Sequence, residues 1–74
     1  MKQIIVTRKK NQDLSILKVL SIFRDRNLIT SLEEIGYYMK MYENNDEVIV
    51  ESNEEDLDDI VRNLTNEGVN FIIK

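Results

Sequence analysis

The chain lacks several residue types on which common protein chemistry depends. Its 74 residues contain no Cys and no His, which excludes disulfide bonds, thiolate or imidazole metal sites, and imidazole catalysis. Pro, Trp and Ala are also absent, and Gly occurs only twice. No run of 18 apolar residues is present, so no segment is expected to cross a membrane. The length favours one small α+β domain over residues 1–74.

The N-terminal residues do not resemble a targeting segment. The apolar run after Lys2 and Gln3 is only three residues long, Ile4–Val6, which is too short for a signal peptide. Because Cys is absent as well, we expect a cytoplasmic protein.

Charge is unevenly distributed along the chain. Residues 1–40 carry eight basic and four acidic side chains, whereas residues 41–74 carry two basic and ten acidic ones. The net charge is −4. Such an asymmetry can orient a charged partner over about one Debye length, roughly 8–10 Å. It is equally compatible with the ordinary charged surface of a small domain.

Hydrophobic periodicity predicts three strands and three helices in a defined order. Residues 2–7 alternate as a strand, residues 13–26 are expected to form a helix capped by Asp13, and Asn27 to end it. A second helix is predicted from Thr30 or Ser31 to about Tyr42, followed by a turn over 44–46 and a strand over 47–51. A last helix starts at Ser52 or Asn53 and ends at Gly68 before a strand over 69–73.

The stretch 37–42 has a second interpretation. Read as a strand, it gives the split strand–helix–strand plan of ferredoxin-like domains. The helical spacing of Leu32, Ile35, Met39 and Tyr42, behind a good cap, favours the helix. The predicted fold is therefore a three-stranded sheet with helices on one face.

A sheet covered on one face leaves one isoleucine of each strand outside. With Ile4, Val6 and the matching apolar residues turned inward, alternation directs Ile5, Ile49 and Ile72 outward. Three neighbouring isoleucines make an apolar patch of the size that monomers use for binding, unless neighbouring polar side chains cover them. We expect a homodimer or a protein partner at this patch or at the widely apolar helix 13–26.

Three segments of this predicted order resemble the C-terminal domain of the bacterial ribosomal stalk protein, whose fold is shared with the Clp-protease adaptor. The segment 53–69 resembles the family's capped acidic turn, amphipathic helix, glycine and closing strand. Residues 16–20, Ile-Leu-Lys-Val-Leu, and residues 32–35, Leu-Glu-Glu-Ile, resemble family motifs on the first two helices. The resemblance implies a protein-docking or adaptor role, and it places Lys18 in the family's basic docking stripe.

The remaining side chains do not suggest catalysis. Carboxylates, Lys and Tyr are the only acid–base groups left, and we expect no enzyme activity, cofactor or metal site. The carboxylate run from Glu51 to Asp59 lacks the pattern of a calcium loop and reads as a solvated helix start. The three tyrosines, Tyr37, Tyr38 and Tyr42, read as core and rim packing, with a stacking platform or hot spot as the alternative.

Basic residues of the N-terminal half are the expected charged rim of a protein interface. They are Arg8, Lys9, Lys10, Lys18, Arg24 and Arg26. The same residues, with tyrosines nearby, would suit RNA or single-stranded nucleic acid on a ferredoxin-like sheet. The acidic pI of about 4.7 argues against nucleic acid. The identity of the protein partner is not encoded in any motif.

Overall fold

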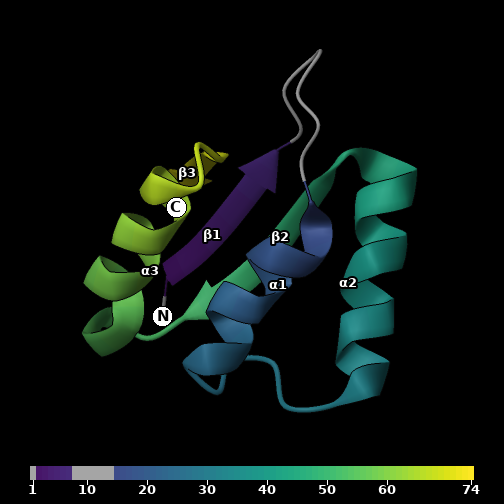
Figure 1. Cartoon of the computed structure of the whole chain (residues 1–74), viewed down its shortest axis with the longest axis horizontal. Helices are drawn as coiled ribbons and strands as arrows, with labels where there is room; N and C mark the ends of the chain where they lie inside the picture. Colours follow the sequence, from purple (N-terminus) through teal and green to yellow (C-terminus); the bar gives the residue numbers. More distant parts are fainter. Residues whose placement is uncertain (1, 8–14) are drawn as a thin grey trace.

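The computed structural model describes residues 2–7 and 15–74. Its elements follow the predicted order (Figure 1): β1 (Lys2–Thr7), α1 (Ile16–Asp25), α2 (Leu32–Asn45), β2 (Glu47–Ser52), α3 (Glu54–Asn66) and β3 (Asn70–Ile73). The expected cap at Asp13 lies outside the described residues, and α1 begins at Ile16 with Ser15 as its N-cap residue.

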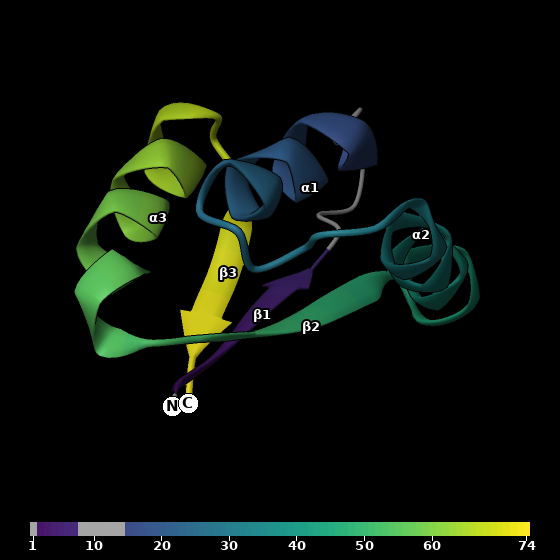
Figure 2. The same ribbon diagram turned by 90° about the horizontal axis from the view of Figure 1, so that it is seen from below.

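The three strands form one antiparallel sheet with β1 in the centre, in the order β2-β1-β3. Figure 2 shows α1 above the sheet, with α3 on the side of β3 and α2 on the side of β2, while no described element crosses the opposite face. The predicted α+β architecture is confirmed. The ferredoxin-like alternative is wrong, because residues 37–42 belong to α2 and not to a strand.

A capping network fixes the start of α2. The Ser31 hydroxyl accepts a hydrogen bond from the backbone N–H of Glu34 (3.2 Å), and the Glu34 carboxylate accepts one from the Thr30 hydroxyl (3.0 Å). The first contact satisfies a backbone N–H that the first helical turn leaves without a partner, and the second ties the Glu34 side chain back to the residue before the cap. The start of α2 is therefore stabilised by contacts within the segment 30–34.

The predicted turn at residues 44–46 is wrong in its position. Helix α2 continues through Asn45, and Asp46 ends it in the left-handed region at φ 57°, with its N–H donating to the Tyr42 carbonyl (2.9 Å). The preference of asparagine for turns is weak, and the packing of a buried side chain in the last turn of the helix outweighs it. Tyr42 is that side chain, because it belongs to the core.

Helices α1 and α3 end in the same backbone motif. After α1, the Leu28 N–H donates to the Phe23 carbonyl (3.0 Å), with Asn27 in the left-handed conformation at φ 60°. After α3, Gly68 takes the equivalent position at φ 69°. Both ends have the hydrogen-bond pattern of a Schellman motif, which the sequence indicated through Asn27 and Gly68.

The core lies between the sheet and the helices. Its strand residues are those predicted to point inward on β1 and β2, packed against α1 and α3 through Val19, Leu20, Phe23, Ile60 and Leu64. Ile73, also predicted inward, is 39% exposed and is the last residue of the edge strand β3. Among the described helices, none has the length and apolar character needed to span a bilayer.

Candidate protein-interaction surfaces

The uncovered face of the sheet is organised in three rows that run across the strands. The strand register and the paired hydrogen bonds between Gln3 and Lys74 define them. The central row is apolar and the two outer rows are polar. The central row is Ile49–Ile5–Ile72, and the outer rows are Glu51–Gln3–Lys74 and Glu47–Thr7–Asn70.

The three isoleucines of the central row share one surface to different degrees. Ile5 in the central strand is only 8% exposed, whereas Ile72 on the edge strand is 53% exposed and Ile49 is half-buried. Neighbouring side chains therefore shield the middle of the row and leave its β3 end open. The register brings together the three residues that the sequence assigned to this face.

An aromatic groove extends this face beyond the outer edge of β2. It has a volume of about 560 Å³ and is lined from three parts of the chain: Tyr37, Tyr38 and Met41 of α2, Gln3, Ile49 and Glu51 of the sheet, and Asn27 and Leu28 between α1 and α2. The Ile49 N–H donates to the Met41 sulfur (3.4 Å), so α2 occupies part of the exposed edge of β2.

The two tyrosines of this groove differ in environment. Their rings meet edge to face with centroids 5.3 Å apart, and Tyr37 is the more exposed of the two. Burial raises the pKa of the Tyr38 phenol, and the nearby carboxylates of Glu34 and Glu51 raise it further. The third tyrosine, Tyr42, is buried in the core, as the packing interpretation predicted.

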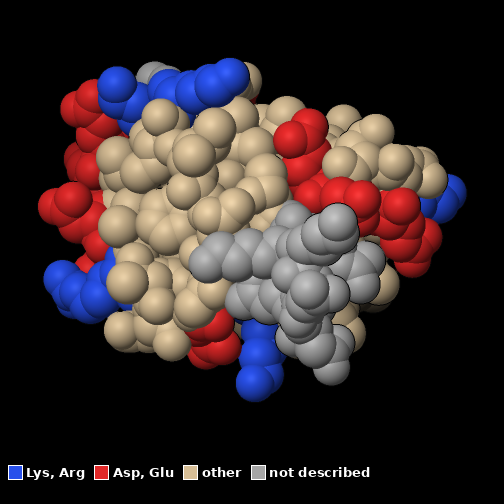
Figure 3. All heavy atoms as spheres, turned by 90° about the horizontal axis from the view of Figure 1, so that it is seen from above, with Lys and Arg blue, Asp and Glu red and all other residues tan. Residues whose placement is uncertain are grey.

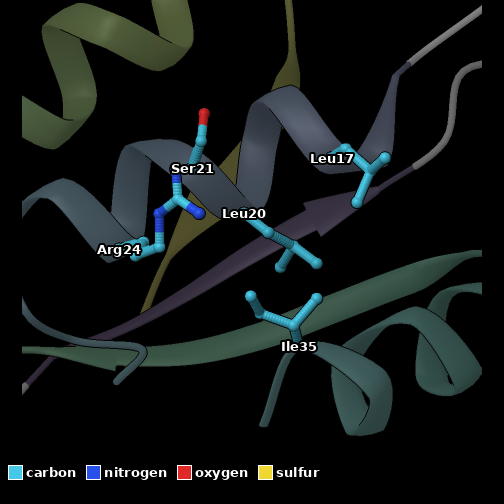
Figure 4. Close-up of a pocket in the computed structure, with 5 residues that line it drawn as sticks. All are labelled: Leu17, Leu20, Ser21, Arg24 and Ile35. Atoms are coloured by element: carbon cyan, nitrogen blue, oxygen red, sulfur yellow. The ribbon is translucent and has the colours of Figure 1, made fainter. Parts of the chain in front are cut away.

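A second apolar groove separates α1 from α2 on the helical side. Its volume is about 260 Å³, and it is lined by Leu17, Leu20, Ser21 and Arg24 of α1 and Ile35 of α2. Figure 4 shows Leu20 and Ile35 pointing toward each other from the two helices, with Leu17 at one end and Arg24 at the other. The groove thus combines an apolar floor with a cation at one end.

Two leucines make this second surface unusually apolar. Leu17 is 58% exposed at the groove, and Leu32, one turn before Ile35, is 85% exposed. The wide apolar arc of α1 is not covered on all sides, and Leu17 is a residue of this arc that stays exposed. The sheet and the two neighbouring helices, α2 and α3, do not cover the whole of this arc, so part of it reaches solvent.

The predicted basic rim does not form one patch. Lys18 lines a groove of about 420 Å³ between α1 and α3, whereas Arg24 lines the one between α1 and α2. Arg26 makes an ion pair with Asp59 of α3 (2.8 Å). At about 100° per residue, Lys18 and Arg24 lie roughly 120° apart around α1, which explains the separation. Arg8, Lys9 and Lys10 lie outside the described residues.

Acidic side chains gather on the flanks of the molecule. In Figure 3 they cover the side of α3 on the left and that of α2 on the right, with mainly uncharged surface between the two. The predicted acidic start of the last helix is confirmed, since Glu54, Glu55 and Asp56 form the first turn of α3 behind the cap Asn53. In the described part of the chain, no group of three or more acidic residues is arranged to hold a metal ion.

No known protein family, curated protein or solved structure matches this chain.

Proposed function

We propose that this chain is a non-catalytic protein-interaction module that docks a short segment of another protein in the groove between α1 and α2. The observation that carries the proposal is the exposure of Leu17 in that groove, together with the exposed Leu32 one turn before the lining residue Ile35. Side chains of this size leave water favourably, at about 25 cal/mol per Å² of apolar area. A partner that covers them therefore gains binding energy which the isolated domain does not use.

The partner's chemistry follows from the lining of the groove. Leu17, Leu20 and Ile35 accept apolar side chains, and the Arg24 guanidinium can pair with a carboxylate. In the described part of the chain, no carboxylate lies within ion-pairing distance of Arg24, in contrast to Arg26. A suitable segment carries two apolar anchors with an Asp or Glu next to them.

The resemblance to the ribosomal stalk C-terminal domain is compatible with this proposal and remains a prediction. It implies docking on the first two helices, which are α1 and α2. Our proposal rests on the apolar lining and on Arg24, and not on the basic stripe of that family. The adaptor role implied by the same resemblance is one form that docking of a protein segment can take.

Nucleic-acid binding is the weaker candidate for the described residues. Lys18, Arg24 and Arg26 are spread over two grooves and one ion pair. Phosphate binding depends on several cations that act together, and its affinity falls by about one log unit per log unit of salt for each phosphate contacted. Binding of single-stranded RNA with such a salt slope would replace the proposal.

A displayed library of random peptides tests the docking groove directly. The wild-type domain is expected to enrich peptides with paired apolar residues and an adjacent acidic residue. Arg24→Glu should reverse the charge preference toward Lys or Arg, because only the sign at the end of the groove changes. Leu17→Asp should abolish the enrichment.

Lys18→Glu is the matched control, because it makes the same charge change on α1 but faces the groove toward α3. This variant should enrich the wild-type peptides. Circular dichroism must show the wild-type helix content for every variant. If Arg24→Glu and wild type enrich the same peptides, the groove is not the docking site.

A further inference from the structure

The uncovered face of the sheet has a charge pattern that complements itself. In the row Glu51–Gln3–Lys74, a carboxylate stands at the β2 end and an ammonium group at the β3 end, on either side of the central strand. The adjacent row is the apolar Ile49–Ile5–Ile72. A face with a positive group at one end of a row and a negative group at the other can form ion pairs with a second copy of the same face.

We propose that two copies of this chain associate through this face, with the twofold axis parallel to the strands. Sheets that pack face to face keep their strand directions within about 30° of each other, which this axis allows. Each row then faces the same row of the second copy with its ends exchanged. β2 of one copy lies over β3 of the other.

This orientation pairs opposite charges and apolar side chains at once. Glu51 faces Lys74 of the second copy, and Lys74 faces Glu51, so two equivalent ion pairs form. Ile5 meets Ile5 at the centre, and each Ile72 meets Ile49. Ile72, which is 53% exposed in the single chain, is thereby removed from water in both copies.

The alternative twofold axis, perpendicular to the strands, is disfavoured by charge. It would exchange the two polar rows, so that Glu51 of one copy faced Glu47 of the other. Like charges in direct opposition destabilise such a pairing. Charge complementarity therefore favours the arrangement in which the twofold axis is parallel to the strands.

The dimer is expected to be weak. Nine side chains on three short strands bury less than the roughly 800 Å² per partner of a standard interface, even with the groove beside Tyr37 and Tyr38 added. The groove between α1 and α2 lies on the opposite, helical side and stays open in both copies. Self-association and the proposed docking of a segment are consequently independent of each other.

Analytical ultracentrifugation of charge variants tests both the dimer and its orientation. Wild type should dimerise reversibly with increasing concentration. Glu51→Lys alone and Lys74→Glu alone should each be monomeric at concentrations where wild type is a dimer, because each creates two like-charge pairs. An equimolar mixture of the two variants should dimerise again, since every pair in the mixed dimer is then of opposite sign.

Matched controls separate this effect from net charge. Lys18→Glu makes the same charge change as Lys74→Glu on the helical side, and Glu55→Lys matches Glu51→Lys on α3. Both should dimerise like wild type, and circular dichroism must show all four variants folded. A wild-type monomer at the highest attainable concentration would overturn the proposal. So would a dimer that survives both variants, or a variant mixture that stays monomeric.

Discussion

At the scale of single residues, environment separates side chains that look alike in the sequence. Tyr37 and Tyr38 are neighbours on α2, yet only Tyr38 is half-buried next to Glu34 and Glu51. Leu20 is buried in the core, whereas Leu17, one turn earlier on the same helix, is open to solvent. Sequence alone predicted the core positions of β1 and β2, because alternation determines them. It missed the exposure of Leu17, because on a helix with a wide apolar arc the exposed position depends on where the neighbouring helix stops covering it.

Tyr38 provides a prediction of pH dependence. Its pKa in the folded chain is raised above the ordinary tyrosine value of 10.0, first by burial and then by the nearby Glu34, Tyr37 and Glu51. The folded state therefore holds the phenolic proton more tightly than the unfolded state does. The resulting stability is fully present below about pH 10 and is lost as the pH rises through the folded pKa.

The free energy of unfolding in urea, measured at several pH values from about 8 upward, tests this. Tyr38→Phe should lose less stability than wild type over the alkaline range, because it has no phenol to ionise. Tyr37→Phe keeps the Tyr38 phenol and should retain most of the wild-type loss. Equal alkaline losses in Tyr38→Phe and wild type would contradict the position of Tyr38 beside Glu51.

At the scale of helices and strands, local signals determined most boundaries. The start of α2 was predicted at Thr30 or Ser31 and that of α3 at Ser52 or Asn53, and the capping residues are Ser31 and Asn53. Asn27 and Gly68 predicted the ends of α1 and α3. The end of α2 was misplaced by three residues, because the turn preference of Asn44 and Asn45 is weaker than the packing of Tyr42.

The two glycines are expected to respond to alanine in opposite directions. Gly36 lies within α2 with no atom within 4 Å of an added Cβ, so Gly36→Ala should stabilise the chain by about 0.5–1 kcal/mol. Gly68 has the same free space but a φ of +69°. Gly68→Ala should therefore cost about 1–2 kcal/mol.

Thermal or urea unfolding of both variants measures these changes. Neither added methyl group meets a neighbouring atom, so steric contacts do not contribute to either change in stability. The opposite signs of the two changes therefore report the difference in backbone conformation between Gly36 and Gly68. Destabilisation by Gly36→Ala would contradict a helix over this segment. It would instead favour the alternative in which residues 37–42 form a strand.

At the scale of the whole molecule, the order of helices and strands predicts a sheet covered by helices on one face. It predicts the proposed binding surfaces only in part. Alternation predicted that Ile5, Ile49 and Ile72 share one face, and the register aligns them in one row. The ion pair of Arg26 with Asp59 could not be predicted, since it depends on how α1 and α3 lie against each other in the folded chain. The separation of Lys18 from Arg24, by contrast, follows from helical spacing alone. The result is a domain with two apolar surfaces on opposite sides of one sheet.

The central claim is that these two surfaces act independently, one for a second copy and one for a segment of another protein. Methyl NMR spectra, recorded on dilution and again during titration with a peptide from the displayed library, test it most directly. Dilution should shift the methyl signals of Ile5, Ile49 and Ile72, and the peptide those of Leu17, Leu20 and Ile35, with the core methyls of Ile4 and Ile60 as the reference. The account would be contradicted if dilution left the three sheet isoleucines unchanged, or if dilution and peptide shifted the same set of methyl groups.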